Sequence, residues 1–195
     1  MKNFLYITFL ILFFATSQNI VSGQSSFGIS FGSVLGDNGN IINDNVKTFR
    51  NGYQTGVFGS FGTYSIFISP GIYYKSFTID TVYNKLNPFE RAPGIKMVKG
   101  KLTLGYQTKI LTRKIKLKIG AGINESYILS ISGNDQGINF DTADDYYTGY
   151  NIDIGLDFFS LYLNVSYEKS IKEVLSINGN KSGLDFIILS AGVYF

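Results

Sequence analysis

The chain ends with the segment D-F-I-I-L-S-A-G-V-Y-F, which runs from Asp185 to Phe195. From Ile187 onward every second residue is apolar, and these residues are Ile187, Leu189, Ala191, Val193 and Phe195. The residues that alternate with them are mixed, because Ser190 and Gly192 stand among them. A strand with one apolar face and one mixed face, closing on an aromatic residue, is typical of the last strand of an outer-membrane β-barrel.

The same alternation of apolar residues recurs along the chain and indicates further strands. We expect eight strands, at residues 25–35, 52–62, 64–78, 94–108, 113–129, 146–158, 161–171 and 184–195. Long polar connections alternate with tight ones such as Phe159-Ser160. Transmembrane barrels show this pattern because their extracellular loops are long and their periplasmic turns are short. The sequence therefore predicts an all-β fold, an eight-stranded antiparallel up-and-down transmembrane β-barrel.

The amino-terminal segment has the features of a secretory signal peptide. Lys2 precedes an apolar run from Phe4 to Ala15, which is shorter than the ~20 residues that a membrane-spanning helix needs. Val21-Ser22-Gly23 fits the small-residue cleavage rule, and cleavage after Ser17 is an alternative. We expect residues 1–23 to be removed and residues 24–195 to form one barrel domain in the cell outer membrane.

Composition limits the chemistry that this chain can perform. The sequence has no cysteine and no histidine, its charged content is 16%, and its formal net charge is +3. It therefore lacks thiolate metal sites, the commonest general base and the commonest transition-metal ligand. A serine or threonine nucleophile would need a lysine base, and no such arrangement stands out. We predict no enzyme activity, no catalytic residues, no cofactor or metal, and no nucleic-acid partner.

Strand parity places charged side chains on the face opposite the apolar one, inside the barrel. The predicted interior charge network contains Lys99, Lys101, Lys114, Lys116, Lys118, Asp153, Asp157 and Glu168. Antiparallel pairing of 113–129 with 146–158 would bring Lys114 near Asp157 and Lys118 near Asp153. A structural network is the expected role, because an eight-stranded barrel is just wide enough for its own side chains. A proton or ion path along these residues is the alternative.

Aromatic residues near the strand ends predict two girdles at the membrane interfaces. The periplasmic girdle would contain Phe61, Tyr64, Tyr106, Phe158 and Phe195, and the outer girdle Tyr53, Tyr74, Tyr127, Tyr147 and Tyr167. A further polar group lies in one long connection, where Asp135, Asp141, Asp144 and Asp145 form an acidic segment. We expect these carboxylates to be solvated, or to contact divalent cations that bridge surface lipopolysaccharide.

Several strands resemble those of one known family. F-I-S-P-G-I-Y-Y-K from Phe67, K-I-G-A-G-I-N-E-S-Y-I-L-S from Lys118, and Y-N-I-D-I-G-L-D-F-F from Tyr150 are similar to strands of the PorT-like outer-membrane β-barrels of Bacteroidetes. Two departures are that Val165-Ser166 stands before Tyr167 where the family often has an arginine, and that Lys101-Leu102-Thr103 lacks the family's proline. The resemblance implies an eight-stranded antiparallel barrel. The founding member of the family is implicated in type IX protein secretion, so the resemblance also suggests a role there.

The predicted function is a structural or interaction role without an open pore. The loops would contact outer-membrane lipid and lipopolysaccharide, or an unidentified surface or secretion partner. An accessory role in type IX secretion is the alternative that the resemblance implies. A soluble lipocalin-like barrel is a weaker alternative, since it would need apolar residues inside and polar ones outside. Val193 and Phe195 are expected to form the insertion signal read by the outer-membrane assembly machinery.

Overall fold

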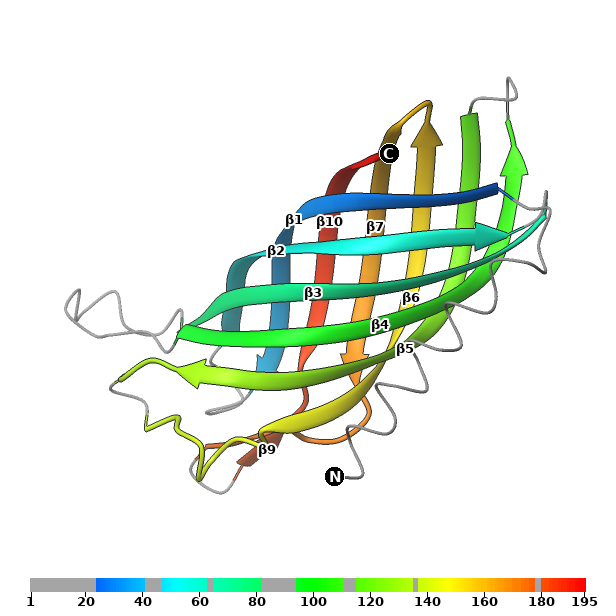
Figure 1. Ribbon diagram of the computed structural model, residues 1–195. Helices are drawn as coiled ribbons and strands as arrows, with labels where there is room; N and C mark the ends of the chain where they lie inside the picture. The colour runs from blue at the N-terminus through cyan, green and yellow to red at the C-terminus, as the bar shows by residue number, and fades with distance from the viewer. Residues whose placement is uncertain are drawn as a thin grey trace, which may run out of the picture.

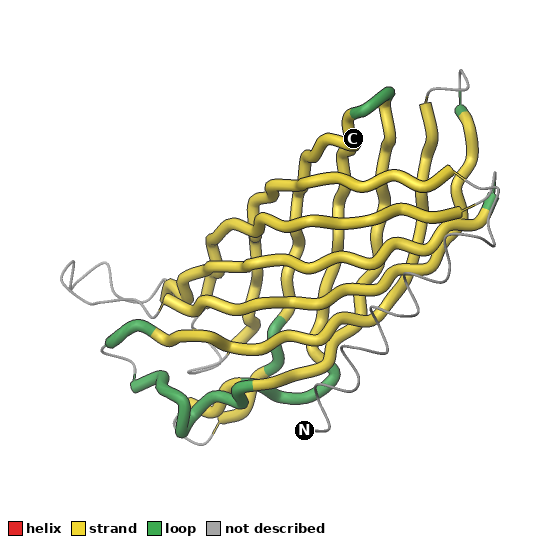
Figure 2. The backbone as a smooth tube through the Cα atoms, viewed as in Figure 1, coloured by secondary structure: helices red, strands yellow, loops and turns green. Residues whose placement is uncertain are grey.

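The computed structural model describes residues 24–40, 47–62, 65–81, 94–110, 115–134, 137–177 and 180–195, and most of them lie in β-strands (Figure 2). The strands are β1 Gln24–Asn40, β2 Lys47–Gly62, β3 Ile66–Thr81, β4 Gly94–Lys109, β5 Ile115–Ile131, β6 Tyr146–Phe158, β7 Leu161–Ser170, β8 Leu175–Ile177, β9 Asn180–Ser182 and β10 Asp185–Tyr194. Within these ranges, no helix is long and apolar enough to cross a membrane. The expected signal peptide lies outside the described residues.

Eight of the strands form one closed antiparallel barrel, in the order β1-β10-β7-β6-β5-β4-β3-β2. The wall is closed by β10, which pairs with β1 from Gly28 opposite Tyr194 to Leu35 opposite Ile187. In Figure 1 the nearer strands cross the farther ones at a steep angle, as expected when strands tilt to close a barrel. The predicted all-β, eight-stranded antiparallel barrel is confirmed.

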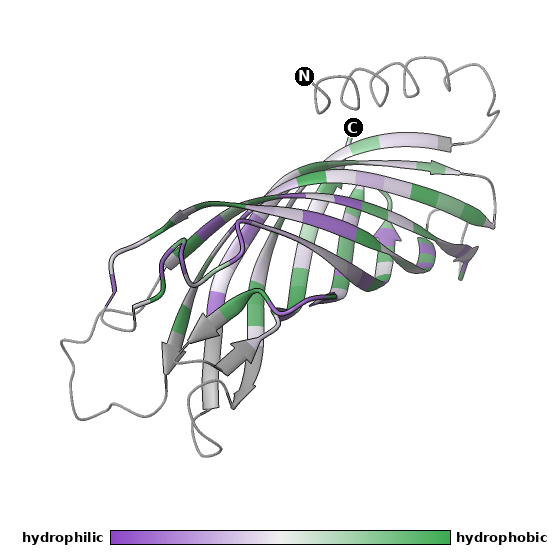
Figure 3. Cartoon of the chain, turned by 90° about the horizontal axis from the view of Figure 1, so that it is seen from below, coloured by the Kyte–Doolittle hydropathy of each residue, from purple (hydrophilic) through white to green (hydrophobic). Residues whose placement is uncertain are grey.

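The barrel wall has two chemically different faces, because successive side chains of a strand point to opposite sides. In β6, Ile152 and Ile154 face outward and are about half exposed, whereas Asn151 and Asp153 face inward and are buried. The same alternation runs through β7, where Val165 is exposed and Ser166 is buried. Figure 3 shows hydrophobic and hydrophilic positions alternating along the strands. Apolar side chains therefore cover the outside of the wall.

The two ends of the barrel differ in the length of their connections. One end, here called the short-turn end, carries the β2–β3, β4–β5 and β6–β7 connections and the C-terminus (Figure 1). At this end Phe159 adopts a φ of 56° in the two-residue turn between β6 and β7. Its ring contacts that of Phe158 edge-on, with centroids 4.7 Å apart. The other end, the long-loop end, carries the β1–β2, β3–β4, β5–β6 and β7–β10 connections.

Some strands extend beyond the limits that the sequence predicts. Strands β1 and β2 continue past the apolar alternation, with Asp37 opposite Phe49 and Asn40 opposite Lys47. Backbone hydrogen bonding in an antiparallel pair does not depend on apolar side chains. The polar residues after Leu35, which the sequence pattern assigns to a loop, therefore belong to the strand.

The hairpin formed by β8 and β9 was not predicted. It lies in the β7–β10 connection, and Leu175 pairs with Ser182. The two residues between its strands in the sequence are Asn178 and Gly179. Asn-Gly is a strong hairpin signal because both residues tolerate a positive φ. The hairpin signal thus lies in a segment that the apolar alternation assigns to a loop.

Candidate functional site

The interior of the barrel is the candidate site, and its side chains form layers along the barrel. A group around Lys118 and Asp157 lies toward the short-turn end, where Tyr194 at the end of β10 joins it. The charged side chains linked to Glu168 and Asp153 follow, and we call all these buried ion pairs the ionic network. A cluster of apolar side chains, the outer cluster, fills the interior toward the long-loop end.

Glu168 is the centre of the ionic network. This carboxylate projects inward from β7, and Lys75 Nζ from β3 donates to its Oε2 at 2.7 Å. Lys99 Nζ from β4 donates to Oε1 of the same carboxylate and also to the side-chain oxygen of Gln54, at 2.6 Å. Lys101 Nζ lies 3.7 Å from Oε1. Lys75, Lys99 and Glu168 are almost completely buried, so the network neutralises charges that water does not reach.

Asp153, on β6, forms the second centre of the network. Lys101 Nζ donates to its Oδ1 at 2.7 Å, and the side-chain amide of Asn164 donates to the same oxygen at 3.4 Å. Its Oδ2 accepts from Thr103 Oγ1 at 2.9 Å and from Asn151 Nδ2 at 2.6 Å. Both carboxylate oxygens are therefore held by donors, which stabilises the ionised form inside the barrel.

A separate ion pair joins Lys118 to Asp157 at 2.7 Å. Lys118 Nζ also donates to Ser60 Oγ at 2.9 Å and to the hydroxyl of Tyr194 at 3.1 Å. The expected pairing of Lys118 with Asp153 is wrong. In the observed register Lys116 lies opposite Asp157 and Gly120 opposite Asp153, which is a shift of two residues from the predicted alignment.

A shift of two residues leaves every side chain on its predicted face, because the side-chain period of a strand is two. For this reason the inward direction was predicted correctly while the partner was not. Lys116 is half-buried at the short-turn end of β5. Lys114, and with it the expected Lys114–Asp157 pair, lies outside the described residues.

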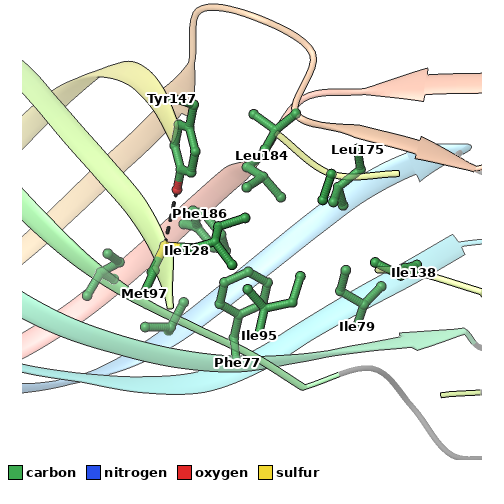
Figure 4. Close-up of a cluster of buried hydrophobic side chains, with 14 residues drawn as sticks. Phe77, Ile79, Ile95, Met97, Ile128, Ile138, Tyr147, Leu175, Leu184 and Phe186 are labelled. Carbon is green, nitrogen blue, oxygen red and sulfur yellow. Dashed lines mark hydrogen bonds between the residues drawn. The ribbon is translucent and has the colours of Figure 1, made fainter. Parts of the chain in front are cut away.

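The outer cluster was not predicted. It comprises Val34, Phe77, Ile79, Ile95, Met97, Ile128, Ile138, Ala143, Tyr147, Val174, Leu175, Leu184, Phe186 and Ile188. Figure 4 shows side chains from several strands and from the long connections converging on one another. Phe77 and Phe186 meet edge-on with ring centroids 4.9 Å apart. The inner face of β10 thus changes from Ser190 and Gly192 to apolar residues toward the long-loop end.

Tyr147 belongs to this cluster, and its predicted place in the outer girdle is wrong. Its side chain is buried, and its hydroxyl donates to Met97 Sδ at 3.3 Å (Figure 4). Tyr146 is the residue that faces outward, with 57% of its surface exposed. In the same girdle Tyr53, Tyr127 and Tyr167 do face outward. Tyr64, which is expected in the periplasmic girdle, lies outside the described residues.

Two long connections are bound to each other above the outer cluster. Ala143 and Leu175 form a β-bridge, and the backbone N–H of Asp144 donates to the carbonyl of Val174 at 2.9 Å. A turn at Asn139 holds Phe140 in a half-exposed position next to this pairing. We call the described residues 137–145, 171–177 and 180–184 of these two connections the loop pair. Apolar residues on its inner side, including Ile138 and Val174, close the cluster from above.

The acidic segment lies on the outer side of the loop pair. Asp141, Asp144 and Asp145 are exposed, and Asp135 lies outside the described residues. No group of three or more carboxylates in the described part of the chain is arranged to hold a metal ion. The expected contact with bridging divalent cations stays a prediction.

Some buried polar atoms of the interior have no hydrogen-bond partner among the described residues. They are Asn124 Nδ2, Ser126 Oγ and Asn151 Oδ1, which project from β5 and β6 next to the lysines of β4. Buried polar atoms are normally satisfied by protein or by ordered water. The interior of this barrel therefore offers hydrogen bonds that its own side chains do not complete.

Comparison with known proteins finds solved structures that are similar to this chain, but no matching family. No family model and no curated protein matches the chain. Neisserial surface protein A is 11% identical, with 88% of this chain and 99% of that chain covered and a TM-score of 0.49. The N-terminal β-barrel domain of OprF from Pseudomonas aeruginosa is 16% identical, with coverages of 89% and 100% and a TM-score of 0.44. The outer membrane enzyme PagL is 15% identical, with coverages of 84% and 98% and a TM-score of 0.47.

These comparisons assign no family to the chain. Its resemblance to PorT-like barrels, and the type IX secretion role that the resemblance implies, stay predictions from the sequence.

Proposed function

We propose that this protein is an integral outer-membrane β-barrel with a closed lumen, which acts through the loops at its long-loop end. The observation that carries the proposal is the apolar outer surface of the barrel wall. Large apolar side chains project outward from every strand of the barrel, and examples with about 60% of their surface exposed are Phe31, Ile72 and Leu104. Water-soluble proteins rarely expose a continuous apolar surface of this extent, whereas a lipid bilayer requires one.

The charged and apolar layers support a closed lumen. An ion crossing the barrel would have to separate the ion pairs of Glu168, Asp153 and Asp157, and breaking a buried pair costs about 3–5 kcal/mol. It would then meet the outer cluster, in which Phe77, Met97 and Ile188 are almost completely buried. The side chains of this cluster offer an ion almost no polar atoms to replace its hydration shell. The exceptions are the Tyr147 hydroxyl and the Met97 sulfur.

The loop pair supports an interaction role at the cell surface. Its two segments are already joined by backbone hydrogen bonds, so a partner that binds there would spend little free energy on ordering them. Phe140 and the nearby Asp141 and Asp144 are exposed on this side. Lipopolysaccharide, or the surface of another envelope protein, is the partner class that we propose for this end.

Insertion of the barrel is proposed to depend on its last strand. Val193 faces outward, and Phe195 is 79% exposed while its backbone N–H donates to the carbonyl of Phe27. Phe195, which directly follows β10, is therefore displayed on the lipid-facing side, where the outer-membrane assembly machinery could read it.

A single substitution tests the membrane location. Ile154 lies on the outer face of β6 with 53% of its surface exposed, and Ile154→Arg would cost about 2–4 kcal/mol if this position faces the middle of the bilayer. We expect the variant to reach the detergent-extracted outer-membrane fraction at a strongly reduced level. Phe140→Arg in the loop pair is the matched control, and it should insert normally.

In a soluble barrel the same arginine at Ile154 would be harmless, and wild-type protein would be released by carbonate without detergent. That result would overturn the proposal and favour a lipocalin-like barrel. Planar-bilayer recordings of the purified barrel test the closed lumen separately. We expect no discrete conductance steps, and regular channel openings would contradict a closed lumen.

A further inference from the structure

We propose that two copies of this barrel pair side by side in the membrane, through the part of the outer wall formed by β5, β6 and β7. The inference rests on the membrane location proposed above. Two opposite charges on this surface carry it, Glu125 on β5 and Lys169 on β7. In the pair, Glu125 of each copy faces Lys169 of the other, and Tyr150 of both copies lies near the two-fold axis.

Glu125 is a carboxylate on the lipid-facing side of the wall. Its neighbours on the same face of β5 are Ile123 and Tyr127, which are about half exposed. Thr148 Oγ1 donates to both carboxylate oxygens, at 3.1 Å each. None of the ion pairs between described residues includes Glu125. An ionisable side chain on the lipid-facing surface is unfavourable by itself, so a cation from outside the barrel would be stabilising here.

Lys169 supplies an accessible cation on the same surface. Its side chain is 44% exposed, and its Nζ lies 3.3 Å from Asp185 Oδ2. A lysine ammonium group has three donors, so one carboxylate does not use all of them. Lys169 is therefore able to keep its contact with Asp185 and also to donate to Glu125 of a second copy.

The stagger of the strands fixes how the two charges lie relative to the membrane. A row of paired residues, followed from β1 to β2 and onward to β10, leaves β1 at Gln24 and returns to it at Val34. The row thus climbs toward the long-loop end by the ten residues from 24 to 34 while it crosses eight strands. Two strands along a row correspond to a climb of about two and a half residues.

This climb places the two charges at the same height. Ile123, Tyr150 and Lys169 share one row, which crosses two strands from β5 to β7 in the climbing direction. Lys169 therefore lies about two and a half residues above Ile123, and Glu125 lies two residues above Ile123 on β5. The Cα atoms of Glu125 and Lys169 are then roughly 12 Å apart along the wall, with Tyr150 between them.

Equal height and opposite charge are the conditions for a two-fold pair of barrels. The axis of such a pair is perpendicular to the membrane, so each residue meets one at its own height across the axis. Glu125 and Lys169 meet this condition twice in one pair, while Ile123 and Tyr150, which are 54% and 39% exposed, lie between them. Lipopolysaccharide does not fit this position as well, because its phosphate groups are anionic and Glu125 would repel them.

Cysteine cross-linking in native outer membranes tests the pairing, because the chain has no cysteine of its own. Tyr150→Cys places one thiol beside the proposed axis, so mild oxidation should join two copies through a single disulfide. Tyr53→Cys is the matched control, because Tyr53 is also an outward tyrosine, 43% exposed, and its strand β2 lies four strands away from β6. We expect a product of twice the mass from Tyr150→Cys and none from Tyr53→Cys.

Charge exchange between copies tests the two contacts. Glu125→Lys and Lys169→Glu, each combined with Tyr150→Cys, place like charges opposite each other when the two copies carry the same substitution. We expect each to lower the yield of the cross-linked product at least fivefold. Co-expression of both variants with different tags should restore the yield for the mixed pair alone, because every contact in that pair again joins opposite charges.

Heat-modifiable migration of each variant shows whether its barrel has folded and inserted. An inserted barrel whose two reporters cross-link equally, or not at all, would overturn the pairing and leave the proposed membrane function intact. A mixed pair that yields no more product than its parents would also overturn the inference, and so would a product that contains a different protein. Release of the wild-type barrel without detergent would instead remove the proposed function. Should Tyr150→Cys fail to insert, Ile123→Cys is the second reporter beside the axis.

Discussion

The ionic network and the outer cluster fill the same barrel by opposite means. The network around Glu168 holds side chains in place through charge-assisted hydrogen bonds with specific partners. The outer cluster around Phe77, Phe186 and Ile188 has few polar contacts and depends on packing. A buried ion pair adds little net stability when both partners are present, but it is costly to break, whereas apolar packing contributes stability in proportion to buried area. The two halves should therefore respond differently to substitution.

The largest effect is expected from Glu168→Gln. The substitution leaves Lys75 and Lys99 buried beside a neutral amide, and this should lower the free energy of unfolding by about 3–5 kcal/mol. The change is measured by urea unfolding in detergent. Far-UV circular dichroism is the probe, because the chain has no tryptophan for fluorescence. Adding Lys75→Met and Lys99→Met to Glu168→Gln should restore much of the loss. A triple variant as unstable as the single one would show that uncompensated charge is not the cause.

The outer cluster is tested by two consecutive residues of β10. Ile188 is fully buried in the cluster, and Ile187 points outward with 49% of its surface exposed. Ile188→Ala should lower the free energy of unfolding by about 2–5 kcal/mol, because it leaves a cavity. Ile187→Ala changes the same number of atoms on the lipid-facing side and should cost clearly less. Equal losses in the same unfolding assay would mean that the cluster is not packed as described.

The junction between the two regions allows a finer test. Lys75 Nζ lies 4.0 Å from the centroid of the Phe186 ring, so one side chain of the network rests on one of the cluster. We expect a coupling energy of about 0.5–2 kcal/mol between Lys75→Met and Phe186→Leu in a double-mutant cycle. A second cycle that pairs Lys118→Met with Phe186→Leu serves as the control. Coupling of similar size in both cycles would argue against a direct contact.

The smallest effect is expected for the ion pair on the outer wall. Lys169 and Asp185 lie 3.3 Å apart, and their side chains are 44% and 31% exposed. Asp185→Asn should change the free energy of unfolding by about 0–1 kcal/mol, because water and salt screen an exposed pair. The comparison with Glu168→Gln isolates the effect of burial. A loss above about 2 kcal/mol would show that this pair is shielded from solvent.

Strand alternation was enough to predict the fold and the inward direction of the charged residues. Lys99, Lys101, Lys118, Asp153, Asp157 and Glu168 all project into the interior of the barrel. The alternation could not predict which carboxylate each lysine contacts. That pairing depends on the register between neighbouring strands, which the β4–β5 and β5–β6 connections impose. The same parity would have placed Tyr146 outside and Tyr147 inside, had it been carried from Ile152 and Ile154 to the start of β6.

The outer cluster was harder to predict for a different reason. Part of the cluster comes from the long connections, where Ile138, Val174 and Leu175 lie among polar residues without a regular period. A strand pattern says nothing about residues that fold back over the end of a barrel. Strand parity also places Lys75 on the inner face of β3, but the predicted network does not include it. Its neighbours on that face, Tyr73 and Phe77, make the face look largely apolar.

The pairing of β10 with β1 joins the end of the domain to its beginning, with Tyr194 opposite Gly28. Contacts between residues so far apart in the chain form late in folding, since a long segment must be ordered before they can contribute. Until the last strand arrives, both edges of the sheet keep unpaired N–H and C=O groups, and such edges recruit other chains. Closure is therefore a single late event that depends on synthesis of the whole domain, and before it the chain needs protection from aggregation.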